Sequence, residues 1–238
     1  MNYNSHQCQQ LIVALDTPSV YQAQLLIKKL CPITTTFKVG LELFSVQSPN
    51  LLGSLKEAGA EQLLVDLKLH DTPNTVEYTA QALARGGSWG ITVHTLGGYD
   101  MMSAATVGVS TNPETLVFGV TVLTSLEERD LRDLGFEDGI KEQATRLAML
   151  ASAAQCNGVI ASPQEIEIIR DAVPDNFLII TPGIRPAWAN QDDQKRTMTP
   201  AQAIRAGADY IVVGRPITQA LNPLIAAESI VQDIRRAL

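Results

Sequence analysis

Residues 11–30 have the sequence LIVALDTPSVYQAQLLIKKL and contain one complete strand–loop–helix unit. The apolar run Leu11–Leu15 predicts a short buried strand. Thr17 followed by Pro18 predicts a helix start, with threonine as the N-cap and proline at the first helical position. An apolar helix face follows at three- and four-residue spacing, formed by Val20, Ala23, Ile27 and Leu30. A strand followed by an amphipathic helix is the building block of a parallel α/β fold.

The same alternation of short apolar runs and longer amphipathic stretches continues along the chain. Eight strands are predicted: Leu11–Leu15, Thr36–Val39, Gln62–Leu67, Gly90–His94, Thr115–Val122, Gly158–Ile160, Phe177–Thr181 and Tyr210–Val213. Their average spacing, about 30 residues, is the length of one strand–loop–helix unit. Eight such units predict the fold class α/β, a (β/α)8 TIM barrel, with residues 1–238 as one domain.

The connection after the seventh predicted strand is unusually long. Residues 182–200 have no clear helix or strand pattern and include the polar run 191–196. Loops of this length in a compact barrel are usually functional lids or disordered segments.

The composition argues against several classes of protein. Lys and Arg number 18 against 25 Asp and Glu, and the resulting net charge of −7 would repel a nucleic-acid backbone. The apolar runs are far shorter than the ~20 residues that span a bilayer, and residues 1–10 have no signal-peptide pattern. Cys8, Cys31 and Cys156 are odd in number and lack metal-site spacing. We therefore expect a cytoplasmic protein without nucleic-acid or membrane partners.

Polar residues lie at or just after the carboxyl ends of the predicted strands, where barrel enzymes place their chemistry. They are Asp16, Lys38, Asp66, Lys68, His94, Thr124, Thr181, Gly214 and Arg215. Ionisable groups that meet on one rim must pair to offset their desolvation. Each alone could be a capping or rim residue, and Asp16 before Thr-Pro fits a turn equally well. The whole set predicts one polar site.

The densest segment is residues 66–75, DLKLHDTPNT. In an extended strand Asp66 and Lys68 point to the same face, and Asp71 follows in the loop. Carboxylates around an ammonium keep it charged and fixed, which suits a proton donor better than a Schiff-base lysine. The alternative is a buried ion-pair network that only orders the loop.

A second segment, residues 207–217, has the sequence GADYIVVGRPI. The backbone N–H of Gly214 and the guanidinium of Arg215 meet near a helix start, where barrels often bind phosphate. The alternative is a tight turn with a surface arginine.

These segments resemble a known family. Residues 66–75, Gly214–Ile217 and Thr181–Arg185 are similar to the signature segments of the orotidine 5′-phosphate decarboxylase family. The similarity extends over Leu11–Asp16, Phe37–Gly40, Val120–Ser125 and Ser162–Glu165. It implies decarboxylation of orotidine 5′-monophosphate, a nucleotide substrate, to uridine 5′-monophosphate in pyrimidine biosynthesis. It also implies no metal, no organic cofactor, and a homodimer with shared active sites.

The resemblance implies roles for individual residues. Lys68 would donate the proton, with Asp66 beside the substrate carboxylate and Lys38 bonded into the same network. Asp16 and Lys38 would hold the ribose, and Thr124 the pyrimidine edge. Asp71 and Thr75 would reach into the neighbouring subunit's site. The phosphate would be held by Arg185, Gln194, Gly214 and Arg215. The implied substrate-binding set also includes Leu67, Leu69, His70, Thr72, Pro73, Asn74 and Pro182.

Two positions depart from the family's pattern. Thr72 stands where a bulky aliphatic residue is usual, so its hydroxyl makes the implied pocket less apolar. Leu69 stands where an aromatic residue is common, and we expect a neutral packing change. His70 and His94 lack metal-ligand partners at suitable spacing, and we expect structural or hydrogen-bonding roles for both.

Three alternatives remain at this point. A metal-dependent sugar-phosphate lyase of the same superfamily would carry a glutamate where Lys38 ends the second predicted strand, and a lysine there would repel a divalent cation. A barrel isomerase of tryptophan or histidine synthesis would share the phosphate site but would not need the Asp66, Lys68 and Asp71 array. An inactive nucleotide-binding protein would not need to retain Lys68.

Overall fold

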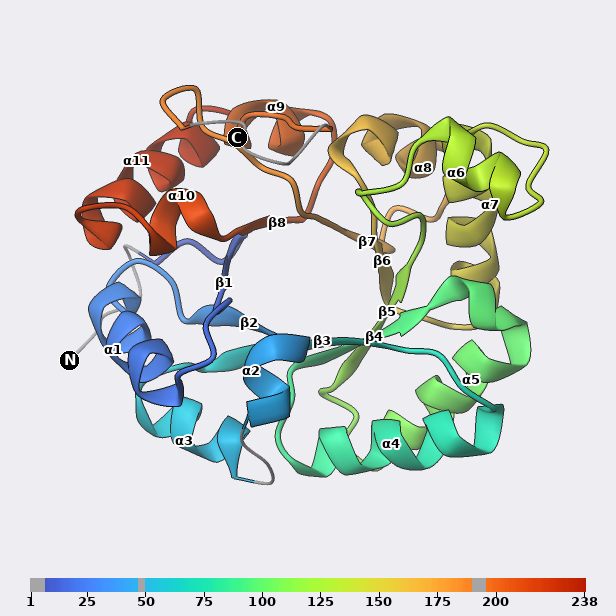
Figure 1. The fold of residues 1–238 in the computed structure, drawn as a ribbon, viewed down its shortest axis with the longest axis horizontal. Coiled ribbons are helices and arrows are strands. Elements are labelled where there is room, and N and C mark those ends of the chain that lie inside the picture. Colours follow the sequence, from blue (N-terminus) through green and yellow to red (C-terminus); the bar gives the residue numbers. More distant parts are fainter. Residues whose placement is uncertain (1–6, 47–49, 190–195) are drawn as a thin grey trace.

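Eight parallel strands pair in sequence order and close into a barrel, which confirms the predicted (β/α)8 fold (Figure 1). The computed structural model describes residues 7–46, 50–189 and 196–238. The strands are β1 (Leu11–Ala14), β2 (Thr36–Gly40), β3 (Gln62–Leu69), β4 (Gly90–His94), β5 (Leu116–Val120), β6 (Gly158–Ile160), β7 (Leu178–Thr181) and β8 (Tyr210–Val213). All eight lie at predicted places, although β5 is shorter and β3 longer than the pattern indicated.

The helices form a ring outside the strands (Figure 1). They are α1 (Val20–Leu30), α2 (Leu41–Val46), α3 (Leu51–Glu57), α4 (Pro73–Arg85), α5 (Gly98–Val109), α6 (Glu128–Asp133), α7 (Ile140–Ala153), α8 (Ile166–Ala172), α9 (Pro200–Arg205), α10 (Arg215–Thr218) and α11 (Pro223–Arg235). Short 3-10 helices η1 (Thr95–Gly97) and η2 (Pro163–Glu165) follow β4 and β6. Within the described residues, several strand connections therefore contain two helices. None of these helices is long and apolar enough to cross a membrane.

The first unit shows how local sequence forms one strand and one helix. Helix α1 begins at Val20 with Ser19 as its N-cap, and the Ser19 hydroxyl accepts from the Gln22 backbone N–H at 3.3 Å. The predicted start at Thr17 was therefore two residues early, because the Thr17 hydroxyl accepts from the backbone N–H of Ser19 instead. The predicted apolar face is confirmed, since Ala23, Ile27 and Leu30 are fully buried.

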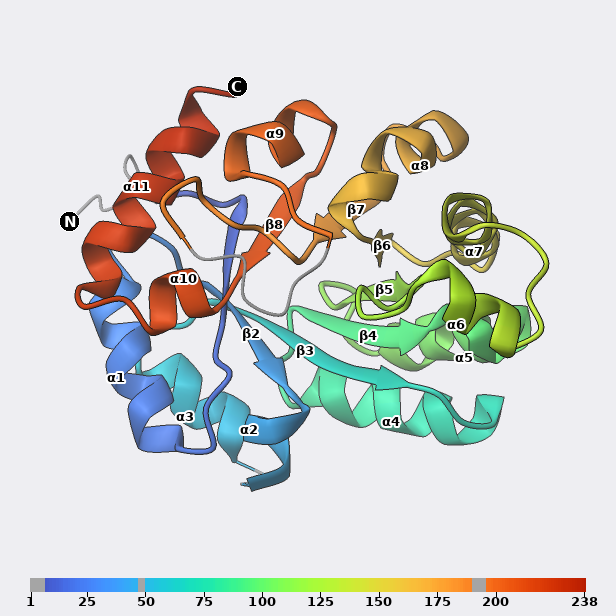
Figure 2. The ribbon, with the colours of Figure 1, turned by 45° about the horizontal axis from the view of Figure 1, so that its top comes forward.

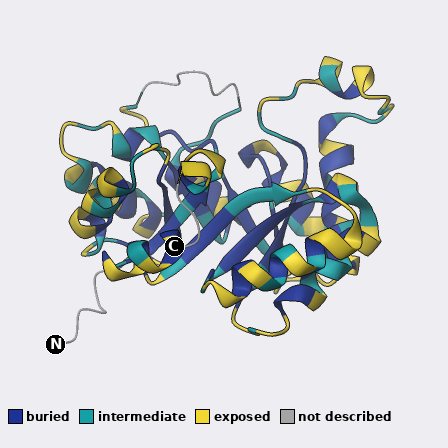
Figure 3. Ribbon diagram, turned by 60° about the horizontal axis from the view of Figure 1, so that its bottom comes forward, coloured by how far each residue is buried: buried dark blue, intermediate teal, exposed yellow. Residues whose placement is uncertain are grey.

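Alternating strand residues build two core layers. Ile12 and Ala14 of β1 belong to the cluster inside the barrel, whereas Leu11 and Val13 belong to the larger cluster between strands and helices. The interior cluster is Ile12, Ala14, Leu64, Phe118, Ile180 and Val212. Most strand residues are buried, and the exposed residues lie on the outer sides of the helices and in the loops (Figure 3).

Gly90 makes room for the largest fully buried side chain of the interior cluster. A Cβ at Gly90 would lie only 2.8 Å from the ring of Phe118. Phe118 fills the interior below the carboxyl ends of the strands, so polar side chains can gather only above it. At that end β8 leads directly into α10, beside β1 and the start of α1 (Figure 2).

Candidate active site

Four charged side chains from three neighbouring strand ends form an alternating line. The Lys38 Nζ lies 3.3 Å from Asp16 Oδ1 and 3.5 Å from Asp66 Oδ2, and the Lys68 Nζ lies 2.9 Å from Asp66 Oδ1. The Asp66 and Lys38 side chains are only 12% and 15% exposed. Each buried charge therefore has an opposite charge beside it, which offsets the cost of removing it from water.

A distortion of β3 brings Lys68 to Asp66. The pairing of β3 with β4 shifts register between Val65 and Leu69, and Lys68 has a φ of 51°. That backbone region costs a residue with a Cβ of order 1–3 kcal/mol and is commonest at functional sites. The two side chains meet as expected, but across a bulge and not by the regular alternation of an extended strand.

Thr92 of β4 holds this distortion in place. Its hydroxyl accepts from the Lys68 backbone N–H at 2.9 Å and donates to Asp66 Oδ1 at 3.0 Å. The Thr92 side chain is fully buried, so both bonds are at least partly shielded from water. Sequence reasoning missed Thr92, although a polar residue inside the apolar strand Gly90–His94 was the available signal.

The lysines determine the charge of Asp66. Burial alone would raise the pKa of this carboxyl, but the ammonium groups of Lys38 and Lys68, together with the hydrogen bonds from Lys68 and Thr92, hold it below its usual range. Asp66 is therefore ionised at neutral pH and keeps a negative charge beside the Lys68 ammonium.

A cavity of about 190 Å³ opens beside the network. Lys38, Asp66 and Lys68 form its charged wall, and Thr124 and Pro182 also line it. The remaining lining residues are apolar: Leu64, Val120, Val122, Leu123, Ile160, Ala161 and Val212. The structure thus brings five of the predicted site residues around one small cavity with fixed charges on one side.

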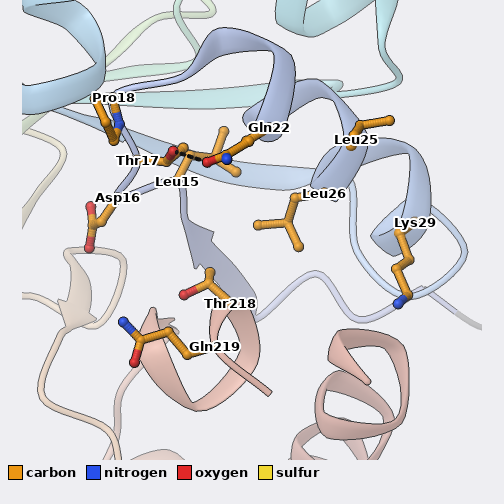
Figure 4. Close-up of a pocket in the computed structure, with 10 residues that line it drawn as sticks. All are labelled: Leu15, Asp16, Thr17, Pro18, Gln22, Leu25, Leu26, Lys29, Thr218 and Gln219. Carbon is orange, nitrogen blue, oxygen red and sulfur yellow. Dashed lines mark hydrogen bonds between the residues drawn. The ribbon is translucent and has the colours of Figure 1, made fainter. Parts of the chain in front are cut away.

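A larger cavity of about 430 Å³ lies between the start of α1 and α10 (Figure 4). It is lined by Leu15, Asp16, Thr17, Pro18, Gln22, Leu25, Leu26, Lys29, Thr218 and Gln219. Of the charge network only Asp16 borders it, and in Figure 4 the Thr17 hydroxyl donates to the Gln22 side chain at 2.9 Å. The smaller cavity is the better candidate site because Lys38 and Lys68 of the charge network line it.

The predicted phosphate residues lie in the connections that follow β7 and β8. A Cβ at Gly214 would lie 3.4 Å from Asp16 Oδ2, so the end of β8 adjoins the charged line. Arg215 is half-buried at the first position of α10. Arg185 is buried, and its Nη1 donates to the carbonyl of Ile184 at 3.0 Å. Gln194 lies outside the described residues.

The segment from Asp71 to Thr75 is exposed at the start of α4. Asp71 Oδ1 accepts from the Thr72 backbone N–H at 2.6 Å, and the hydroxyls of Thr72 and Thr75 lie 3.0 Å apart. Among the described interactions Asp71 does not reach Lys68. Within one chain the predicted array therefore contains Asp66 and Lys68 but not Asp71.

The two histidines of this region stack on each other. The rings of His70 and His94 have centroids 5.5 Å apart, and His94 Nδ1 accepts from the Leu96 backbone N–H at 3.3 Å. Burial, together with the neighbouring His70 and Lys68, lowers the pKa of His94. The described residues contain no cluster of three or more side chains suited to hold a metal ion.

The fold and the cavity together define the class of the protein. A closed barrel with ionised side chains at the carboxyl ends of its strands has the architecture of a (β/α)8-barrel enzyme.

Comparison with known proteins gives the family within that class. Residues 9–230 match the family model described as "Orotidine 5'-phosphate decarboxylase / HUMPS family", and the chain belongs to this family. It is 44% identical to an orotidine 5′-phosphate decarboxylase of Moorella thermoacetica, with 96% of this chain and 93% of the relative covered. It is also 44% identical to the orotidine 5′-phosphate decarboxylase of Hydrogenovibrio crunogenus, with 99% of this chain and 100% of the relative covered.

A solved structure supports the same grouping. The orotidine 5′-phosphate decarboxylase of Lactobacillus acidophilus superimposes with a TM-score of 0.84 and 36% identity, covering 95% of this chain and 99% of that one. The protein is accordingly a carboxy-lyase.

Proposed function

We propose that the protein converts orotidine 5′-monophosphate to uridine 5′-monophosphate in de novo pyrimidine biosynthesis, without a metal or an organic cofactor. The observation that carries the proposal is the line Asp16–Lys38–Asp66–Lys68 beside a small, largely apolar cavity. The names of the relatives from Moorella and Hydrogenovibrio agree with it.

The chemistry of the reaction explains the choice of residues. Loss of CO₂ from C6 of the pyrimidine leaves an electron pair in the plane of the ring, with no conjugated π system to accept it. A fixed ammonium beside C6 stabilises the developing negative charge and then supplies the proton. Lys68 is held for this role by Asp66 at 2.9 Å, whose lowered pKa keeps it ionised. The largely apolar lining lowers the local dielectric constant, which strengthens the interaction.

Lys38 argues for a metal-free reaction. Its ammonium lies between Asp16 and Asp66, at 3.3 and 3.5 Å, and Lys38 occupies the position where a metal-dependent lyase of the superfamily would carry a glutamate ligand. Because both carboxylates already face a positive charge, a second cation there would be repelled.

The resemblance to the family supplies the remaining proposed contacts. Asp16 and Lys38 would bind the ribose hydroxyls, and Thr124 the pyrimidine edge. The phosphate would lie near the ends of β7 and β8, against Arg185, Gly214 and Arg215, with Gln194 from the same long connection. Binding energy from this remote phosphate can lower the barrier at C6.

We also propose a homodimer in which Asp71 and Thr75 complete the partner's site. Both residues are exposed in one chain, and α4, η1 and α5 carry exposed apolar side chains. These are Tyr78, Leu96 and Tyr99, which are 62%, 43% and 48% exposed. Helices α4 and α5 lie side by side (Figure 1), so their exposed aromatic residues suit an interface.

The proposal places the enzyme in the cytoplasm as one domain of residues 1–238. This rests on Cys31 and Cys156, which suit the role of small hydrophobic residues in a reducing compartment.

An ultraviolet assay for loss of orotidine 5′-monophosphate tests this function directly. Protein dialysed against EDTA should consume the substrate as fast as untreated protein and release uridine 5′-monophosphate. A requirement for added Mg²⁺ would favour the sugar-phosphate lyase instead. Binding of the nucleotide without turnover would favour an inactive binding protein.

A further inference from the structure

A second buried ion pair lies outside the lysine network, on the opposite side of Thr124. Arg196 Nη1 donates to Glu165 Oε1 at 2.6 Å, and the two side chains are only 11% and 1% exposed. Arg196 Nη2 donates to the backbone carbonyl of Leu123 at 3.1 Å. One guanidinium thus connects the turn after β6 to the loop after β5.

Glu165 is fixed independently of Arg196. In η2, the backbone N–H of Ser162 donates to Glu165 Oε2 at 3.1 Å, which forms a capping box with the Ser162 hydroxyl. The two oxygens of this carboxylate therefore have different partners: one closes the turn after β6, and the other holds Arg196. Arg196 is therefore bound to a carboxylate whose position is fixed by the turn after β6.

The bond to Leu123 lies next to the candidate site. Leu123 and Thr124 both line the cavity that contains Lys68. Thr124 also borders a separate cavity of about 480 Å³, whose lining includes Glu165 and Arg196. Thr124 therefore lies between the two cavities, and the carbonyl of the residue before it is held by Arg196.

We propose that Glu165 and Arg196 are positioning residues that fix the carbonyl of Leu123 and thereby orient Thr124 toward the pyrimidine. The inference rests on the proposed function, because it assigns the pyrimidine to the Thr124 side of the cavity. A buried ion pair is a poor way to gain stability, since desolvation offsets its attraction. A guanidinium that bridges a carboxylate and a carbonyl is well suited to hold two loops at fixed separation.

The ionisation of Glu165 offers an independent signature. Burial raises its pKa to about 7, although Arg196, Ser162 and Lys141 act to lower it. Glu127, Glu128 and Glu142 line the adjacent cavity and add negative charge on the same side. As pH falls through about 7, Glu165 gains a proton and its bond to Arg196 weakens, so Thr124 should lose its orientation on the acid side.

The test is a double-mutant cycle between the ion pair and Thr124. Glu165→Gln keeps the shape of the side chain and its bond to the Ser162 N–H but removes the charge. Glu165→Gln and Arg196→Met are each measured alone and in a Thr124→Val background. We expect each single change to lower kcat/KM roughly 10- to 100-fold. In the Thr124→Val background the same change should cost less than about threefold, because its effect passes through Thr124.

Two controls accompany the cycle. Arg146→Met removes an exposed arginine paired with Asp138 and should leave kcat/KM unchanged. The second control divides the kcat/KM of the wild type by that of Glu165→Gln at each pH. This ratio should fall toward one as the pH drops below about 7, because protonated Glu165 is then uncharged like glutamine. Ionisations of the substrate affect both enzymes equally and cancel in the ratio.

The outcomes are distinct. Full-sized losses in the Thr124→Val background, or unchanged kcat/KM in folded Glu165→Gln, would overturn the positioning role while leaving the proposed function intact. A wild-type protein without decarboxylase activity would overturn both. If Arg196→Met does not fold, the Glu165→Gln arm of the cycle and the pH ratio still decide the question.

Discussion

The ammonium nitrogen of Lys68 lies 2.9 Å from Asp66 Oδ1, across a bulge in which Lys68 has a φ of 51°. The register shift of β3 gives the lysine a backbone conformation that few residues with a Cβ adopt. The fully buried Thr92 compensates for this cost by bonding to the Lys68 backbone and to the Asp66 carboxylate. The position of the proposed proton donor therefore depends on a distorted strand and on its neighbour β4.

Lys68→Ala should remove most decarboxylase activity and leave the fold intact. General acid catalysis and electrostatic stabilisation are lost together, so we expect a fall in kcat of at least roughly 10²–10⁴-fold. Steady-state kinetics measures the loss, and far-ultraviolet circular dichroism checks the fold. Lys28→Ala, which changes an exposed lysine of α1, is the matched control. Near-normal turnover in Lys68→Ala would contradict the assignment.

Thr92→Val should reduce both stability and activity. The change keeps the shape of the side chain but leaves the Lys68 N–H and Asp66 without their buried partner, at a cost of about 1–3 kcal/mol in the free energy of unfolding. Urea denaturation measures this cost, and kcat should fall because Lys68 is less well fixed. Thr145→Val, on α7, removes a hydroxyl that donates to the Lys141 carbonyl within the same helix and should change neither quantity. An unchanged kcat in Thr92→Val would show that the bulge needs no support from β4.

Arg215→Ala should weaken substrate binding and slow turnover. A lost hydrogen bond to a charged group typically costs about 1.5–3 kcal/mol, which is roughly a 10- to 150-fold fall in kcat/KM. Both kcat and KM should change, because remote phosphate binding also lowers the barrier of the chemical step. Orotidine, which lacks the phosphate, should be a very poor substrate and nearly indifferent to the change. Equal losses with both substrates would mean that Arg215 is structural.

Mixing Lys68→Ala with Asp71→Ala should restore activity if the active sites are shared. In a mixed dimer one site then carries both defects and the other carries none. Random exchange makes half of the dimers mixed, so recovery should approach roughly a quarter of wild-type activity. Mass labelling confirms that subunits have exchanged. If exchange occurs without recovery, Asp71 does not act across an interface.

Much of the candidate site was predictable because barrel topology gathers strand ends on one rim. Asp16, Lys38, Asp66 and Lys68 each lie at or near the carboxyl end of a predicted strand, and the structure joins them in one network. The role of Asp71 in the active site stays a prediction, because in a single chain Asp71 is exposed and does not contact Lys68 among the described interactions. Glu165 and Arg196 were missed as a pair, although the Ser-Pro-Gln-Glu capping box around Glu165 was a usable local signal.

The sequence by itself determined the order and direction of the strands and the residues that face the core. Local periodicity is sufficient for this, because side chains alternate across a strand and repeat along a helix, and parallel strands must be joined through helices. Only the tertiary structure decided the bulge at Lys68, the bonds from Thr92 and the bridge from Arg196 to Leu123. These contacts join residues 24 to 73 positions apart in the chain. Their geometry depends on how neighbouring strands pack, which local pattern does not encode.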